Sequence, residues 1–171
     1  QPRIQRVPQA VAQEVEREER DPQGQAREED PDNVRITLDY ARLCLGEGRV
    51  EEAEQVLQSL PRDVREGNDA AALEATLVFA RACVDAPDSA TLSRTLMRDP
   101  NNSALRYQLA ARQVLDQDYD NALDNLMTLL LRDRDYGDHA ARKGLLSLFE
   151  LLGDHDERVS HYRRKMFNAL H

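Results

Sequence analysis

The segment DYARLCLGEGRVEEAEQVLQSL at 39–60 decides the fold, because it returns later in the chain as QLAARQVLDQDYDNALDNLMTL at 108–129. The two segments align without a gap, and small or apolar residues coincide at the spacing that places them on one face of a helix. The coinciding pairs are Ala41 with Ala110, Val50 with Tyr119, Ala53 with Ala122, Leu57 with Leu126 and Leu60 with Leu129. Each copy therefore predicts two helices joined by a short turn.

Helical periodicity continues from residue 33 to the end of the chain, and breaker residues divide it into segments. Gly46 and Gly48 separate the first pair of helices, Pro61 ends the second helix, and Pro87-Asp88-Ser89 supplies an N-cap for the fourth. No alternating run of β-branched residues competes with this interpretation. We expect helices near 33–46, 50–60, 68–85, 88–98, 102–116, 119–133, 138–152 and 156–170.

The offset between the two copies is about twice the roughly 34-residue period of tetratricopeptide repeats. A further repeat should therefore lie between them, and it is degenerate because Asp88 stands where a small residue is expected. The predicted fold is an all-α, tetratricopeptide-like α-solenoid of antiparallel helix pairs, with about eight helices and an additional N-terminal helix. Apolar positions of the middle repeat are filled by Leu73, Ala75, Phe79, Leu92 and Leu96.

The residue types of the repeat have a physical reason. A single pair of short helices cannot hide its apolar faces, so neighbouring pairs must stack and bury them jointly. We expect four alanines to lie where helix backbones approach most closely, and Leu57 and Leu126 to fill the space between helices. The four alanines are Ala41, Ala53, Ala110 and Ala122.

Composition narrows the functional classes. The chain has 171 residues, 40% of them hydrophobic and 32% charged, with a net charge of −9. That charge argues against a nucleic acid partner, whose phosphates require basic side chains, and no run of apolar residues is long enough to span a membrane. Two cysteines without a CxxC spacing, Cys44 and Cys83, indicate small buried hydrophobes in a reducing, cytoplasmic setting. We expect no catalytic, cofactor or metal site, because the four histidines form no known ligand motif.

The first 32 residues differ from the rest. They are charged and interrupted by prolines, which predicts a linker with one short helix, whereas 33–171 form the repeat domain. Val7, Val11 and Val15 share one face of that short helix. The face would be solvated in a linker, or it would dock on another domain or on a second copy of the chain to form a homodimer.

Two segments resemble known proteins. The run ALRYQLAARQVLDQDYDNALDNLMTLLLRD at 104–133 looks like a tetratricopeptide repeat. The tail at 132–171 resembles the C-terminal end of the YbbN/chaperedoxin family, bacterial proteins that join a thioredoxin fold to a helical repeat domain. The matching features are ARK at 141–143, LFELLGD at 148–154 and SHYRRKMFNAL at 160–170.

That resemblance implies a cytoplasmic, stress-linked holdase that shields unfolding clients and passes them to a GroEL-type chaperonin. The thioredoxin domain of the family is absent from this sequence, so no redox activity is assigned to it. In the family the C-terminal helix docks on the chaperonin, and the corresponding helix here is 156–170. The residues of that helix proposed to bind a partner are Arg158, Tyr162, Arg163, Arg164, Met166, Phe167 and Leu170.

The alternative for this helix is a terminal cap, whose cations favour the C-terminal end of the helix dipole. A second candidate surface is a peptide-binding groove on the first helices of the pairs. Its residues would be Arg35, Leu38, Arg42, Leu45, Tyr107, Ala111, Val114 and Leu115, unless they belong to the core. One subclass of tetratricopeptide repeats binds the terminal carboxylate of a peptide with a clamp of Lys and Asn side chains. The corresponding positions here hold Leu38, Tyr107, Arg42 and Ala111, so we exclude that subclass. A generic scaffold or assembly adaptor without a chaperone role is the alternative function.

Overall fold

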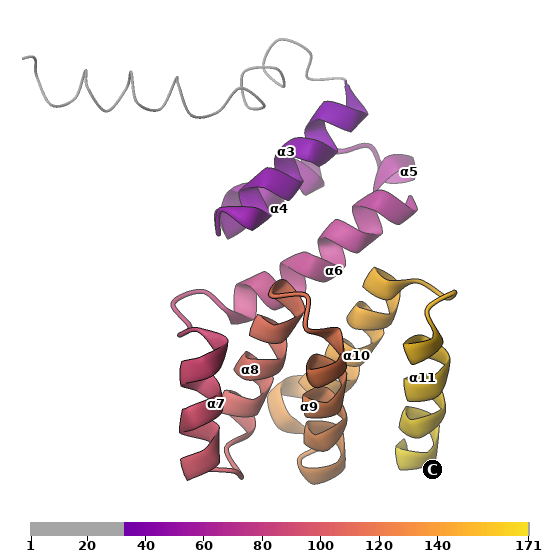
Figure 1. Ribbon diagram of the computed structural model, residues 1–171. Coiled ribbons are helices and arrows are strands. Elements are labelled where there is room, and N and C mark those ends of the chain that lie inside the picture. The colour runs from indigo at the N-terminus through magenta and orange to yellow at the C-terminus, as the bar shows by residue number, and fades with distance from the viewer. Residues whose placement is uncertain (1–32, 171) are drawn as a thin grey trace, which may run out of the picture.

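The computed structural model describes residues 33–170, which form helices and connecting turns without a strand (Figure 1). The all-α repeat architecture predicted from the sequence is confirmed. Val7, Val11 and Val15 of the expected N-terminal helix lie outside the described residues. The helices are α3 (Val34–Gly46), α4 (Val50–Ser59), α5 (Arg62–Arg65), α6 (Asn68–Ala82), α7 (Ser89–Arg98), α8 (Ser103–Leu115), α9 (Tyr119–Arg132), α10 (Tyr136–Leu152) and α11 (Glu157–Leu170).

Helix starts follow the capping residues of the sequence. The side chain of Asp88 accepts a hydrogen bond from the Thr91 amide at 2.8 Å, which confirms the expected N-cap of α7. Asn102 caps α8 in the same way, accepting from the Leu105 amide at 3.0 Å. The short helix α5 was not expected, because four residues are too few to show a helical period.

The turns of the two sequence copies have the same backbone conformation. Gly48 and Gln117 occupy equivalent positions and both are left-handed, with φ of +73° and +62°. In each turn the amide of the following residue donates to the carbonyl five residues earlier, at 2.8 Å in both copies. Gly46 ends α3, as predicted, and the left-handed Gly48 lies in the turn that follows it.

The packing of the two copies is also equivalent. Ala41, Ala53, Ala110 and Ala122 are each 0% exposed, as expected for the closest helix approaches. Leu57 and its counterpart Leu126 are also buried. The hairpins α3–α4 and α8–α9 are therefore two examples of one packing unit.

The middle repeat departs from a regular helix pair. Its expected core residues are buried, but α6 packs mainly on α10 and α8, whereas α7 packs on α8. The connection between α6 and α7 runs over residues 83–88 and contains Pro87 and the left-handed Asp85, with φ of +59°. This longer connection lets α7 leave the side of α6, which explains why the middle repeat is degenerate.

The last two helices pack more on earlier helices than on each other. Residues 137–139 of α10 have φ values of +54° to +62°, so its regular part begins after the predicted start near 138. Helix α11 packs on α9, where Val159 is fully buried and the Tyr162 hydroxyl donates to Asp124 Oδ1 at 2.6 Å. A connection that leaves α10 at Gly153, with φ of +79°, directs α11 towards α9.

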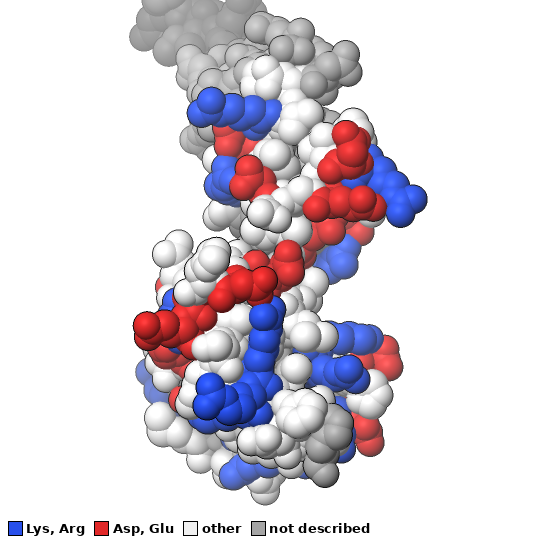
Figure 2. Space-filling model, turned by 90° about the vertical axis from the view of Figure 1, so that its right-hand side faces the viewer, with Lys and Arg blue, Asp and Glu red and all other residues white. Residues whose placement is uncertain are grey.

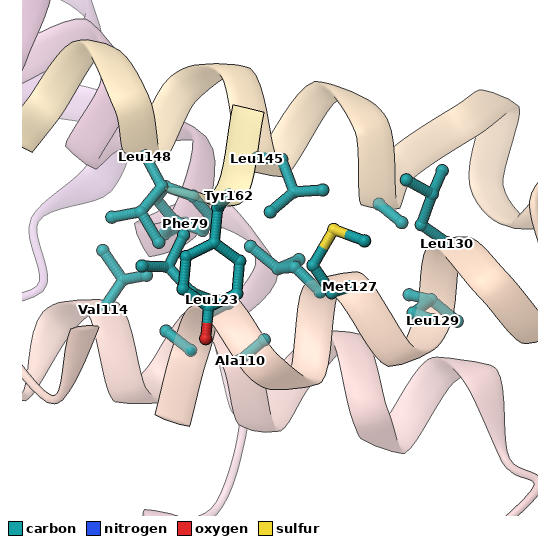
Figure 3. Packing of buried hydrophobic residues seen from close by; sticks show 14 of the residues in the cluster. Phe79, Ala110, Val114, Leu123, Met127, Leu129, Leu130, Leu145, Leu148 and Tyr162 are labelled. Carbon is teal, nitrogen blue, oxygen red and sulfur yellow. The ribbon is translucent and has the colours of Figure 1, made fainter. Parts of the chain in front are cut away.

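The core has two main parts, and α6 belongs to both. Leu73 and Leu77 of α6 join α3 and α4 in the N-terminal part. Phe79 joins residues of α8, α9, α10 and α11 in the C-terminal part, several of which are seen in Figure 3. Figure 1 shows α6 running from the α3–α4 hairpin to the lower helices, and this crossing places one face of α6 between the two packing units.

Candidate protein-binding cleft

A cleft of about 770 Å³ lies where the two packing units meet along α6. The end of α3 and the start of α4 form one wall, and the end of α8 with the start of α9 forms the other. These wall segments include the two equivalent turns at Gly48 and Gln117. The cleft therefore follows from the repeat, because stacking leaves the turns of neighbouring units facing a shared space.

The surface of the cleft is mixed, with somewhat more apolar than polar area. Leu45 of α3, Leu73 of α6 and Leu115 of α8 contribute to its lining. Val84, directly after α6, also lines it and is 48% exposed, so an apolar side chain is accessible at the site. A concave apolar floor is the usual feature of surfaces that bind peptides or other proteins.

The charge of the cleft is mainly negative. Glu51, Asp69 and Asp85 line it, and their carboxylates form no hydrogen bond or ion pair within the described part of the chain. Asp116 also lines it and accepts a hydrogen bond from Ser89 Oγ. The lining also contains two arginines: Arg42 is paired with Asp39 at 2.6 Å, and Arg112 Nη2 donates to the Ala86 carbonyl at 3.1 Å. The four acidic residues outnumber these two cations.

The predicted groove residues divide into two sets. Arg42, Leu45, Val114 and Leu115 line the cleft, although Val114 is only 3% exposed. The remaining four residues do not line it: Arg35, Leu38, Tyr107 and Ala111.

Packing explains why part of the predicted groove is unavailable. Ala111 is 0% exposed within the C-terminal core, so its placement on a binding surface is wrong for this structure. Tyr107 lies against α10, with its ring centre 6.2 Å from that of Tyr136. Burial raises the pKa of Tyr107. The arrangement of α10 across α8 therefore covers a face that would be concave in a regular solenoid.

The sequence interpretation missed the contribution of α6. Asp69, Ala72 and Thr76 line the cleft and recur at a spacing of three and four residues, which places them on one side of the helix. That spacing was visible in the sequence. The sequence does not show that this side of α6 faces the cleft, because that depends on the tertiary arrangement.

Most of the predicted partner-binding residues of α11 make internal contacts. Arg158 pairs with Asp156 at 2.7 Å and lies 5.5 Å from the centre of the Tyr119 ring. Tyr162 is buried, and Arg163 pairs with Asp154 at 2.7 Å. Met166 and Leu170 are partly buried against the core.

Two of the α11 residues predicted to bind a partner are exposed. Arg164 is exposed and forms no ion pair within residues 33–170. Phe167 is 60% exposed. Figure 2 shows basic side chains gathered in the lower half of the molecule, where α11 lies, below a band of acidic ones. The exposed part of α11 is thus locally basic on an acidic protein.

Cys44 and Cys83 are both buried, as predicted, and burial raises the pKa of the Cys83 thiol. Within residues 33–170, no three His, Cys, Asp or Glu side chains are grouped so as to hold a metal ion. None of the described helices is long and apolar enough to cross a membrane.

Stacked helix hairpins beside an apolar cleft define a helical-repeat protein of the kind that binds other proteins. A family model described as tetratricopeptide repeat matches residues 82–171, and a second model with the same description matches residues 24–77. The first match covers more than half of the 171 residues, so the chain belongs to the tetratricopeptide repeat family. No curated protein matches the sequence significantly. Tetratricopeptide repeats are protein–protein interaction modules, and this is the class of the chain.

Proposed function

We propose that the chain is the client-binding part of a co-chaperone and that its cleft holds unfolded segments of other proteins. The observation that carries this proposal is the 770 Å³ cleft with an accessible apolar floor. Unfolded proteins expose apolar side chains, and burying them in the cleft removes apolar surface from water. A holdase of this kind needs no catalytic residue.

The charge of the cleft suggests which segments it prefers. Glu51, Asp69 and Asp85 stand beside the apolar floor and have no cation bound to them within residues 33–170. A client segment that alternates apolar residues with Lys or Arg would satisfy both features, since it would bury its apolar side chains and place its cations at the rim. Acidic segments would be repelled.

A matched pair of variants tests the cleft. Val84 in the cleft and Leu146 on α10 outside it are both 48% exposed. We expect Val84→Gln to weaken binding of an unfolded client by about 1 kcal/mol, or about fivefold, because part of a valine contact is lost. Leu146→Gln should leave binding unchanged. Equal effects of the two variants on the aggregation of a chemically unfolded test protein would contradict the proposal.

The preference for basic segments has its own test. Glu51→Gln combined with Asp69→Asn should weaken binding of a Lys-rich apolar peptide and reduce the dependence of that binding on salt. Glu150→Gln, an exposed change on α10, is the control. A Lys-to-Gln version of the peptide should bind the wild type and the cleft variant equally. If the affinity for the Lys-rich peptide were unchanged, the proposed preference for basic segments would be rejected, whereas the binding of apolar side chains would not be affected.

We further propose that α11 docks on a GroEL-type chaperonin in the cytoplasm. The resemblance of the tail to the YbbN/chaperedoxin family supports this role, together with the exposure of Arg164 and Phe167. Deleting 160–171 would also remove Tyr162, whose hydrogen bond to Asp124 anchors α11, so a point variant is the cleaner test. Arg164→Glu should weaken chaperonin binding, whereas Arg142→Glu on α10 should not. Equal binding by both variants would reject the docking role.

A generic scaffold or assembly adaptor is the second candidate, because the same cleft suits a single defined peptide. The two functions differ in partner range. Capture of one stoichiometric partner, with no effect on the aggregation of unrelated unfolded proteins, would favour the adaptor. Sedimentation of the chain with and without residues 1–30 would show whether that segment mediates a homodimer.

A further inference from the structure

A second cavity, of about 410 Å³, lies at the other end of the α8–α9 hairpin from the cleft. The turn before α8 and the last turn of α9 form it, and its lining includes Arg106, Arg132 and Asp133. In Figure 1 this end of α8 and α9 is at the bottom of the molecule, away from α6.

Two guanidinium groups converge at this cavity. Arg106 Nη2 donates to the Pro100 carbonyl at 2.8 Å, and Arg132 Nη1 reaches the same carbonyl at 3.3 Å. Neither arginine has a carboxylate oxygen within ion-pair distance among residues 33–170. Burial, and then the charge of Arg132, lower the pKa of Arg106. The other acceptors of these guanidinium groups are also neutral, since Arg106 Nη1 donates to Asn125 Oδ1 at 3.0 Å and Arg132 Nη1 reaches Asn101 Oδ1 at 3.3 Å. Two like charges therefore meet among neutral acceptors, an arrangement that an anion would stabilise.

The remaining charges of the cavity indicate which anion fits. Asp133 lines it, and its Oδ2 accepts a hydrogen bond from Ser103 Oγ at 2.5 Å. The positive end of the α8 dipole and the negative end of the α9 dipole both lie here, because Ser103 begins α8 and Arg132 ends α9. The two helix dipoles therefore add no net preference, and the side-chain charges decide. Two arginines and one aspartate leave a single net positive charge in the lining, which matches a carboxylate better than a doubly charged phosphate.

We propose that Arg106 and Arg132 form a carboxylate-binding site, which receives a Glu, Asp or C-terminal carboxylate of a partner protein. Each guanidinium can donate to a separate oxygen of the carboxylate while it keeps or exchanges its bond to Pro100. The site is basic and lies at the far end of the hairpin, whereas the cleft is acidic. It therefore extends the proposed function and does not depend on it, since the two surfaces select opposite charges.

Fluorescence anisotropy with the full chain tests the site. The first probe is a labelled Glu-rich peptide with an amidated C-terminus, and the second is its Gln version with a free C-terminus. Arg106→Gln and Arg132→Gln should each weaken binding about tenfold, the effect expected for one charge-assisted hydrogen bond pair. Arg142→Gln, which removes the same charge from an exposed position on α10, is the control and should bind as the wild type does.

Each outcome decides the proposal. Binding of either probe that is lost in both site variants and kept in Arg142→Gln supports it, and the probe that binds identifies the source of the carboxylate. Equal weakening by Arg142→Gln would mean general attraction to a charged surface and would overturn it. Failure of both probes to bind the wild type would do so as well, as would inorganic phosphate displacing a probe at concentrations more than tenfold below acetate. Circular dichroism of each variant checks that the helices are retained.

Discussion

Each of the two equivalent turns contains one left-handed residue, Gly48 in the first and Gln117 in the second. Replacing the glycine with alanine and the glutamine with glycine should change the free energy of unfolding in opposite directions. Gly48 has φ of +73° and Gln117 has φ of +62°, and nothing lies within 4 Å of a Cβ built at Gly48. Backbone conformation alone therefore sets the effect of Gly48→Ala. A Cβ on a left-handed residue destabilises the folded state by about 1–2 kcal/mol. Alanine also reduces the conformational entropy of the unfolded chain, which stabilises the protein by about 0.4–1 kcal/mol. We expect Gly48→Ala to lower the free energy of unfolding by about 1 kcal/mol and Gln117→Gly to raise it by a similar amount.

Gly46 supplies the matched control for this experiment. It ends α3, its φ is not left-handed, and nothing lies within 4 Å of its built Cβ. Gly46→Ala should therefore stabilise the protein by about 0.4–1 kcal/mol. Urea unfolding followed by circular dichroism measures all three variants, and a shift of about 2–4 °C in Tm per kcal/mol provides an independent check. If Gly46→Ala and Gly48→Ala changed stability in the same direction, the left-handed strain at position 48 would be refuted, and a Gln117→Gly variant no more stable than the wild type would refute the equivalence of the two turns.

Three further predictions concern the core and its electrostatics. Leu126 is fully buried, so Leu126→Ala should lower the free energy of unfolding by about 2–5 kcal/mol, and a loss below 1 kcal/mol in urea unfolding would contradict its core role. Cys44 and Cys83 should react with a thiol reagent only as the protein unfolds, because both are buried; rapid modification of either thiol in the native protein would show otherwise. Hydrogen bonds from Arg158 lower the pKa of Asp156 in the folded state, so its contribution to stability is present above about pH 4 and is lost as the pH falls further. Asp156→Asn should therefore flatten the decline of stability below about pH 4, and an unchanged acid profile would refute the assignment.

The repeat and its helices could be predicted because their determinants are local. Turn residues, caps and the spacing of apolar residues are all visible over a few positions, and the N-cap of α7 at Asp88 was predicted correctly. The equivalent burial of Ala53 and Ala122 also follows from the aligned copies. What could be predicted was therefore the packing unit and its number of helices.

The arrangement between units could not be predicted, since it depends on contacts between residues far apart in the chain. Helix α6 packs on α10 and α8, and the 83–88 connection separates it from α7. Tyr107 lies against Tyr136 of α10, Ala111 is buried in the C-terminal core, and the cleft lies beside the equivalent turns. The convergence of Arg106 and Arg132 on one carbonyl has the same origin, because the two residues lie on different helices.

The most direct test of the proposed client-binding cleft is to locate a bound client on the protein. A photo-reactive amino acid can be placed at Val84 in the cleft or at Leu146 outside it, and both positions are 48% exposed. Irradiation with an unfolded client present should produce cross-links from position 84 and few from position 146. Cross-linking from position 146 that equals or exceeds that from position 84 would show that clients bind elsewhere on the protein.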